Sequence, residues 1–364
     1  MDLQQTRMEN DQRLGPHLEA IARGEMLDAL EPFAKAYLGL YYQLDNSVPP
    51  RQRVASLANE QVTAAIMQGM QSLLLGATVP SAREIGEACL QGHGIGVGYV
   101  LLAAVEEFCT DDVEHVLKLD ERVMAALLCY QFLHTSFQPL PWHERLLQQS
   151  PQAVIKVLQQ FWKPMQLAGK DFLPGLQTLI RGPRYAKLAS SLAIPLLKQW
   201  PQGDIYSLRR LMQRGLASEE TAPLLSLAEL RVAELPVAEI RRKVYWLVTA
   251  FIIEPQGNTD GLSQYIGRTK EKVLPLLDYL VALLQDPCIE RRLSAMDLAR
   301  LLRIIAPVFA RNQGRGGLLD DNSTRVLWLF EQLAAYPEEQ RRVAAQWLST
   351  VRVMRSYADI LASL

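Results

Sequence analysis

The sequence is poor in the side chains that usually hold metals, nucleotides or substrates. Its 364 residues include 4 cysteines and 5 histidines, and 7% of them are aromatic. The cysteines are far apart and form no C-x-x-C pair, so a zinc knuckle and a disulfide framework are both excluded as interpretations. We expect buried free thiols at Cys89, Cys109, Cys129 and Cys288.

Nucleotide-binding motifs are also missing. Gly169-Lys170 is followed by Asp171, so the hydroxyl that holds magnesium in a G-x-x-x-x-G-K-[ST] loop is absent. Gly94-x-Gly96-x-Gly98 lacks both the G-x-G-x-x-G spacing and a preceding strand. We therefore predict a tight turn or a close helix crossing there, and no ATP hydrolysis by this chain.

The densest cluster of acidic and imidazole groups has a structural explanation that needs no bound metal. Asp111, Asp112, Glu114 and His115 fit the first turn of a helix, where carboxylates stabilise the positive end of the dipole. A metal site would need His115 and His134 to face each other with two more ligands, and no H-E-x-x-H or G-x-S-x-G motif is present. We predict no catalytic residue, no metal, no cofactor, and a protein that is not an enzyme.

Long apolar runs and charge of one sign are lacking too. The longest nearly uncharged stretch, Gly92 to Val105, is too short to cross a bilayer of about 30 Å, and we expect a cytoplasmic protein without a membrane partner. The net charge is −1. Residues 1–182 hold 14 Lys+Arg against 20 Asp+Glu, and residues 183–364 hold the remaining 24 against 19. This imbalance is well short of the basic character of a dedicated nucleic-acid binder.

What the sequence does contain is apolar residues at helical spacing almost throughout, so the predicted class is all-α. Residues 51–75 predict one long helix that ends at Gly76. Ser81 with Glu84 matches a capping box, and Ser294 with Asp297 forms a similar pair. Pro151 and Pro337 suit the first turns of two further helices.

Helical runs separated by short connections predict antiparallel hairpins. We expect a flexible lead-in at residues 1–15, an N-terminal helical domain at 16–182 and a C-terminal repeat domain at 183–364. So many helices do not fit one compact core, which favours a right-handed α-solenoid of degenerate HEAT-like hairpins over a less regular bundle. The main runs are 120–137, 151–166, 183–199, 234–253, 270–286, 294–310, 322–335 and 337–350.

Arginine pairs recur through the C-terminal half and are the candidate binding residues. If they occupy equivalent helices, they form a basic groove for phosphates or for an acidic protein surface. The alternative is that each pair lies on the solvated side of its helix and interacts with local carboxylates such as Glu239 and Glu290. The pairs are Arg209-Arg210, Arg241-Arg242, Arg291-Arg292 and Arg341-Arg342.

The longest predicted loop runs from Arg311 to Asn322 and contains Gly314, Gly316 and Gly317. It is either a connector whose acidic end caps the next helix or a loop that contacts a partner.

Four segments of the second half follow one another in a fixed order: residues 242–251, Glu254-Pro255, residues 293–302 and residues 306–309, with the glycine-rich loop and two more helices after them. In their sequence and order they resemble the C-terminal helical-repeat region of bacterial NACHT-type STAND NTPases. The resemblance covers about residues 180–355 and does not include an NTPase core.

This resemblance implies a sensor or adaptor in bacterial antiviral defence, with an NTPase or nuclease effector or a foreign protein as its partner. Two functions therefore stay open at this point. One is a non-catalytic scaffold that binds a protein, and the other is a nucleic-acid-binding accessory that uses the arginine face.

Overall fold

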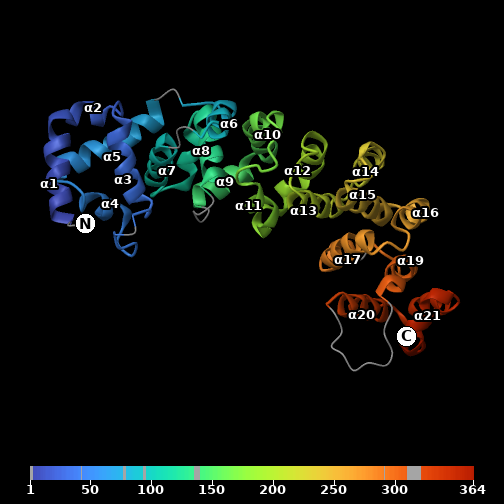
Figure 1. The fold of residues 1–364 in the computed structure, drawn as a ribbon. Helices are drawn as coiled ribbons and strands as arrows, with labels where there is room; N and C mark the ends of the chain where they lie inside the picture. Colours follow the sequence, from blue (N-terminus) through green and yellow to red (C-terminus); the bar gives the residue numbers. More distant parts are fainter. Residues whose placement is uncertain are drawn as a thin grey trace. The chain divides into compact units, whose positions relative to one another are not determined.

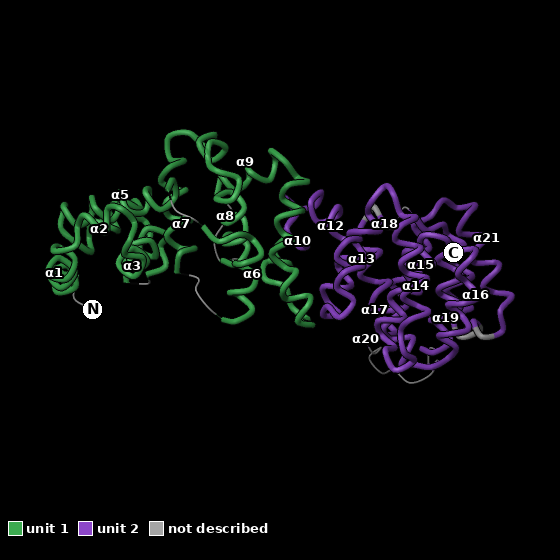
Figure 2. Tube along the Cα trace, turned by 90° about the horizontal axis from the view of Figure 1, so that it is seen from above, with its two compact units in different colours: residues 1–179 green, residues 180–364 purple. Residues whose placement is uncertain are grey.

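The computed structural model describes residues 3–41, 43–76, 79–92, 96–134, 140–290, 292–309 and 321–364, without the side chains of residues 287, 288, 353, 355 and 356. Across these ranges every regular element is a helix, which confirms the all-α class. Gly94, Arg291 and most of the predicted loop from Arg311 to Asn322 lie outside them. The chain divides into two compact units, Met1–Leu179 (unit 1) and Ile180–Leu364 (unit 2) (Figure 2). The boundary is three residues before the one we predicted.

Unit 1 contains ten α-helices in its described residues, and α11 (Leu176–Arg181) spans the boundary with unit 2. Short 3-10 turns, η1 (Gly15–His17) and η2 (Val113–Lys118), lie between some of them. The α-helices are α1 (Leu3–Leu14), α2 (Leu18–Ala22), α3 (Leu27–Tyr37), α4 (Pro50–Ala55), α5 (Glu60–Gly76), α6 (Ala82–Leu90), α7 (Gly96–Phe108), α8 (Glu121–Leu133), α9 (Pro141–Gln149) and α10 (Pro151–Leu167).

Two close helix crossings in unit 1 depend on glycine. Helix α6 packs along α10, and a Cβ at Gly86 would lie 2.1 Å from the carbonyl oxygen of Phe161. Helix α7 packs on α8, and a Cβ at Gly98 would lie 2.5 Å from the ring of Tyr130. The second contact agrees with the close helix crossing predicted for the glycine-rich segment.

Two parts of unit 1 differ from the prediction. Residues 51–75 form two helices, α4 and α5, because the side chain of Asn59 accepts a hydrogen bond from the Val62 amide at 2.9 Å and starts a new helix. The expected lead-in forms helix α1, where Asp11 accepts a hydrogen bond from the Asn59 amide and Asn10 donates one to Leu57. These hydrogen bonds attach α1 to the segment before α5, an attachment that the sequence of α1 does not predict because it lacks apolar periodicity.

Unit 2 also consists of helical hairpins, and most of its expected runs are helical within a few residues of the predicted ends. The exception is the run 234–253, because residues 235–239 connect two helices and the second helix begins at Ile240. Two 3-10 turns, η3 (Pro183–Tyr185) and η4 (Ala306–Phe309), flank α12 and α19, and η5 (Arg352–Tyr357) precedes the last helix. The helices are α12 (Ala186–Gln199), α13 (Ile205–Leu216), α14 (Ala222–Glu234), α15 (Ile240–Ile253), α16 (Pro255–Ile266), α17 (Lys270–Leu284), α18 (Pro287–Glu290), α19 (Ala295–Ile305), α20 (Asp321–Ala334), α21 (Glu338–Ser349) and α22 (Ala358–Ser363).

The helices of unit 2 contact one another in two rows. Helices α13, α15, α17 and α20, the first row, each pack on the next (Figure 1). In the second row α12 packs on α14, α16 packs on α19, and α19 packs on α21. The hairpin partners α12–α13 and α14–α15 join the rows. Unit 2 is thus built largely from contacts between helices that are near in sequence.

The helix starts follow the predicted signals. Ser81 with Glu84 and Ser294 with Asp297 both form complete capping boxes, which confirms the two predictions. Pro151 is the first residue of α10, whereas Pro337 lies one residue before α21. Both positions suit proline, because neither amide has a helical acceptor.

The tryptophans of unit 2 belong to the core rather than to an exposed aromatic surface. Trp200 and Trp246 are 1% and 3% exposed, and Trp328 and Trp347 are half-buried. Such rings stabilise packing and leave little area for a base to stack on. Within the described part of the chain, no helix is long and apolar enough to cross a membrane.

Candidate functional site

The arginine pairs fall on both rows of unit 2 and on a turn, so the fold does not place them at equivalent positions. Helices α13 and α15 belong to the first row, and α21 belongs to the second. The described members are Arg209 and Arg210 on α13, Arg241 and Arg242 on α15, Arg292 in the turn before α19, and Arg341 and Arg342 on α21.

Three of these arginines donate hydrogen bonds to backbone carbonyls. Arg242 Nη1 lies 2.8 Å from the Pro201 oxygen, and its Nε lies 3.2 Å from Glu239. Arg292 Nη2 lies 2.6 Å from the Ser218 oxygen. Arg341 Nη1 lies 3.3 Å from the oxygen of Ala334 at the end of α20. The acceptors lie at or just beyond helix ends, where carbonyls lack helical partners, so these side chains act as ties between segments.

Two arginines outside the pairs do the same. Arg231 Nη2 on α14 lies 2.8 Å from the oxygen of Lys198 near the end of α12. Arg214 on α13 donates from both Nε and Nη2 to the Ile180 oxygen, at 3.1 and 3.0 Å. We call Arg214, Arg231, Arg242, Arg292 and Arg341 the carbonyl-bound arginines. Because their guanidinium groups bind backbone oxygens of the chain itself, these arginines need no external ligand.

Two paired arginines of the first row, Arg209 on α13 and Arg241 on α15, lie near the hydroxyl group of Tyr245. Burial raises the pKa of the Tyr245 hydroxyl on α15, and the nearby positive charges of Arg209 and Arg241 oppose that rise. The Tyr245 ring lies 4.5 Å from that of Tyr279 on α17. The fold therefore brings Arg209 and Arg241 to one neighbourhood, as a groove would require.

A pocket of about 630 Å³ lies entirely within unit 2, and its lining includes Tyr206, whose ring contacts Arg209. Its charged lining consists of Arg181, Arg210 and Arg214 with one acidic residue, Asp286. Its other lining residues are Ile180, Tyr206, Gln213, Ala282 and Gln285. Since three positive groups meet one negative group, the lining has a net charge of +2.

Tyr206 and Gln213 set the geometry of the pocket. The guanidinium carbons of Arg181 and Arg209 lie 4.8 and 5.0 Å from the centre of the Tyr206 ring, within the range of a cation–π contact. Arg210 Nη1 donates to Gln213 Oε1 at 3.1 Å, and Gln213 Nε2 donates to the Ala282 oxygen at 2.9 Å. Gln213 thus links α13 to α17 and orients Arg210 at the same time.

Sequence reasoning singled out Arg210 but missed Arg181 and Arg214. Arg214 lies one helical turn after Arg210, so the spacing within α13 was a signal for it. Arg181 comes from α11, and only the packing of that helix near α13 brings it to the pocket. Arg341 and Arg342 line a different pocket of about 670 Å³ between α21 and α22, with Met354 and Leu361 among its apolar residues.

The two histidines singled out from the sequence as possible metal ligands, His115 and His134, contact different parts of unit 1. His115 Nδ1 lies 3.2 Å from the Phe108 oxygen, while the His134 ring stacks on Tyr99 at 4.3 Å. Burial lowers the pKa of His134 to about 4, and the charge of Lys35 adds to this effect. Among the residues that the structure describes, no group of three or more His, Cys, Asp or Glu side chains is placed to hold a metal ion.

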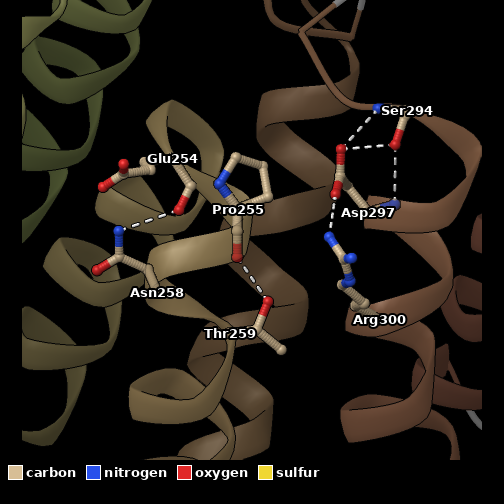
Figure 3. Close-up of polar contacts among 7 residues, drawn as sticks. All are labelled: Glu254, Pro255, Asn258, Thr259, Ser294, Asp297 and Arg300. Carbon is tan, nitrogen blue, oxygen red and sulfur yellow. Dashed lines mark hydrogen bonds and ion pairs between the residues drawn. The ribbon is translucent and has the colours of Figure 1, made fainter.

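Two of the segments behind the NACHT-type resemblance, Glu254-Pro255 and residues 293–302, contain helix starts (Figure 3). After Glu254, Pro255 opens α16, and its oxygen accepts a hydrogen bond from Thr259 Oγ1 at 2.6 Å. At α19, Ser294 and Asp297 form the capping box, and Asp297 also pairs with Arg300 Nη1 at 2.7 Å. These residues have structural roles in the chain.

Comparison of the chain with protein-family models, with curated proteins and with solved structures finds no match in any of the three. The resemblance to the helical region of NACHT-type STAND NTPases therefore stays a prediction that rests on the segments named above.

Proposed function

We propose that the chain is a non-catalytic, cytoplasmic scaffold that binds a protein partner through unit 2, whose hairpins form a right-handed, HEAT-like α-solenoid. The observation that supports it best is the order of helix contacts, in which α13, α15, α17 and α20 pack one on the next. Repeated units of this kind contact only their neighbours and create extended surfaces that suit protein binding.

The carbonyl-bound arginines support a surface of stable shape. Arg231 and Arg242 reach back to the end of α12 and the turn after it, and Arg292 reaches back to the turn after α13. Each such bond joins segments at least 33 residues apart in the chain, so the bonds restrict movement between hairpins. A surface that keeps its shape loses less conformational entropy when a partner binds.

The biological part of the proposal comes from the resemblance alone. A chain similar to the helical region of NACHT-type STAND NTPases, but with no NTPase core, fits a sensor or adaptor in a bacterial antiviral system. Its partner is then an NTPase or nuclease effector, or a foreign protein.

One observation favours a second function, a nucleic-acid-binding accessory. Arg181, Arg210 and Arg214 line one pocket, and guanidinium groups bind phosphates as well as carboxylates. The two functions differ in salt dependence, because neutralising several phosphates makes affinity fall steeply with ionic strength. A largely apolar protein interface is less sensitive to salt.

The test is affinity purification of the intact chain from its own host, with and without nuclease, followed by mass spectrometry of the bound material. Each sample is washed at low and at high salt. A defined protein that remains after nuclease and high salt supports the scaffold. Loss of all bound material after nuclease treatment contradicts it and supports the nucleic-acid function.

A further inference from the structure

The pocket lined by Arg181, Arg210 and Arg214 contains more positive than negative charge, since the carboxylate of Asp286 is the one acidic group in its lining. Among the described residues, none of these three arginines forms an ion pair with a carboxylate. This contrasts with Arg231, Arg242, Arg300 and Arg325, which pair with carboxylates at 2.6 to 3.2 Å. Three guanidinium groups around one pocket without an ion pair are an unusual arrangement, because like charges repel unless an anion lies between them.

The pocket is also held in place before any ligand binds. Arg214 is fixed by its two hydrogen bonds to the Ile180 oxygen, and Arg210 is oriented by Gln213, which is itself bonded to α17. Arg181 lies over Tyr206 and makes no other polar contact with the described chain. A guanidinium that is already oriented loses little entropy when it binds a carboxylate in the bidentate geometry.

We propose that this pocket binds a carboxylate-bearing, acidic segment of the partner protein. The inference rests on the proposed function, since it names the part of unit 2 that the protein partner contacts. The net charge of the lining, +2, complements two Asp or Glu side chains, and a pocket of about 630 Å³ lies within the range that holds a few side chains. Gln285 is exposed at the same pocket and offers amide groups to a peptide backbone.

Several observations favour an acidic peptide over a nucleic acid. The Tyr206 ring already contacts two guanidinium groups, so it is not a free platform for a base. At the α17–α20 end of the first row the charges are balanced, because Asp278 on α17 pairs with Arg325 on α20 at 2.6 Å. A nucleic acid gains affinity from many phosphate contacts along a strand, whereas a short acidic segment needs only a local site.

The experiment measures fluorescence anisotropy of three labelled probes against the full chain. They are a dodecapeptide rich in Glu and Asp, its counterpart with Gln and Asn, and an oligo-dT strand of equal charge. The variants are Arg181→Ala, Arg210→Ala and the double substitution. Arg214 is left intact because it also holds the Ile180 carbonyl. The matched control is Arg268→Ala, which removes one exposed arginine charge elsewhere in unit 2.

We expect the acidic peptide to bind more tightly than its amide counterpart and than oligo-dT. The double variant should weaken peptide binding by about 10- to 100-fold, as expected for the loss of charge-assisted hydrogen bonds, with an unchanged circular dichroism spectrum. Arg268→Ala should change it by less than about 2-fold, because an exposed charge outside the site contributes little.

Four results would overturn the inference: no binding of the acidic peptide, tighter binding of oligo-dT, intact peptide binding by the double variant, or an equal loss with Arg268→Ala. The inference and the proposed function fail separately. If the double variant still retains the protein partner of the intact chain, only the pocket assignment fails. If the intact chain retains no protein after nuclease treatment, the proposed function itself fails.

Discussion

The substitution of glycine by alanine should have opposite effects at two helical positions, and the structure gives the sign of each. At Gly86 on α6, a Cβ would lie 2.1 Å from the Phe161 oxygen and 3.3 Å from Pro164 on α10. At Gly261 on α16, nothing lies within 4 Å of that atom. Both positions are inside helices, so alanine gains about 1 kcal/mol of helix propensity at each.

At Gly261 this gain has no opposing term, and Gly261→Ala should stabilise unit 2 by about 1 kcal/mol. At Gly86 the new methyl group meets a backbone oxygen rather than the end of a flexible side chain, so α6 and α10 must separate by about 1 Å. Overpacking of this kind costs about 1–3 kcal/mol. Because backbone has to move at Gly86, the cost there is at the upper end of this range, about 2–3 kcal/mol. After the propensity gain of about 1 kcal/mol is subtracted, Gly86→Ala should destabilise unit 1 by about 1–2 kcal/mol.

The assay is differential scanning calorimetry of the two variants and the unchanged chain. A change of 1 kcal/mol shifts Tm by about 2–4 °C in a unit of this size, so Gly86→Ala should lower one transition by about 2–8 °C. Gly261→Ala should raise a transition by about 2–4 °C. An increase in Tm for Gly86→Ala would refute the close crossing of α6 and α10 that is visible in Figure 2.

Three further predictions concern a carbonyl-bound arginine, a cap and a buried histidine. Arg242→Ala should destabilise unit 2 by about 1–3 kcal/mol in urea unfolding, because it removes the hydrogen bond to the Pro201 oxygen. Substitution of its exposed neighbour, Arg241→Ala, should change the free energy of unfolding by less than about 0.5 kcal/mol. Equal effects of the two substitutions would contradict the structural role given to the Arg242 hydrogen bond. Ser294→Ala should cost about 1 kcal/mol by removing the N-cap of α19, with Ser294→Thr retaining most of it in the same measurement. Burial holds the pKa of His134 at about 4 in the folded chain against 6.5 for an exposed histidine, so the unfolded state takes up the proton first and stability should fall as the pH drops from about 6.5 to about 4. Urea unfolding across that range should show a smaller pH dependence in His134→Asn, and an unchanged dependence would exclude His134 as its source.

The helices and their starts were largely predictable because their signals are local. Each capping box joins two residues that are three positions apart, Ser81 with Glu84 and Ser294 with Asp297, and both form as this spacing predicts. The break at Asn59 was missed because the apolar spacing continues across it and hides a polar cap. Helix α1 was missed because its support comes from Leu57 and Asn59, more than 40 residues away.

The candidate site was predictable only in part, for the same reason. Arg210 stood out as half of a pair, but Arg181 stands alone in the sequence and reaches the pocket through the packing of α11. The pair pattern also drew attention to Arg242, Arg292 and Arg341, whose guanidinium groups bind backbone oxygens. A count of arginines does not separate those that hold the fold from those that face a ligand, because the separation depends on where each acceptor lies.

The carbonyl-bound arginines have a consequence for how freely this sequence can vary. Their acceptors at Lys198, Pro201 and Ser218 are main-chain oxygens, which every amino acid supplies. The side chain at each acceptor position can therefore be replaced without losing the bond, provided that the backbone keeps its path. Only the arginine is specified. A chain built in this way can change the side chains at these acceptor positions and keep the same contacts between its helices.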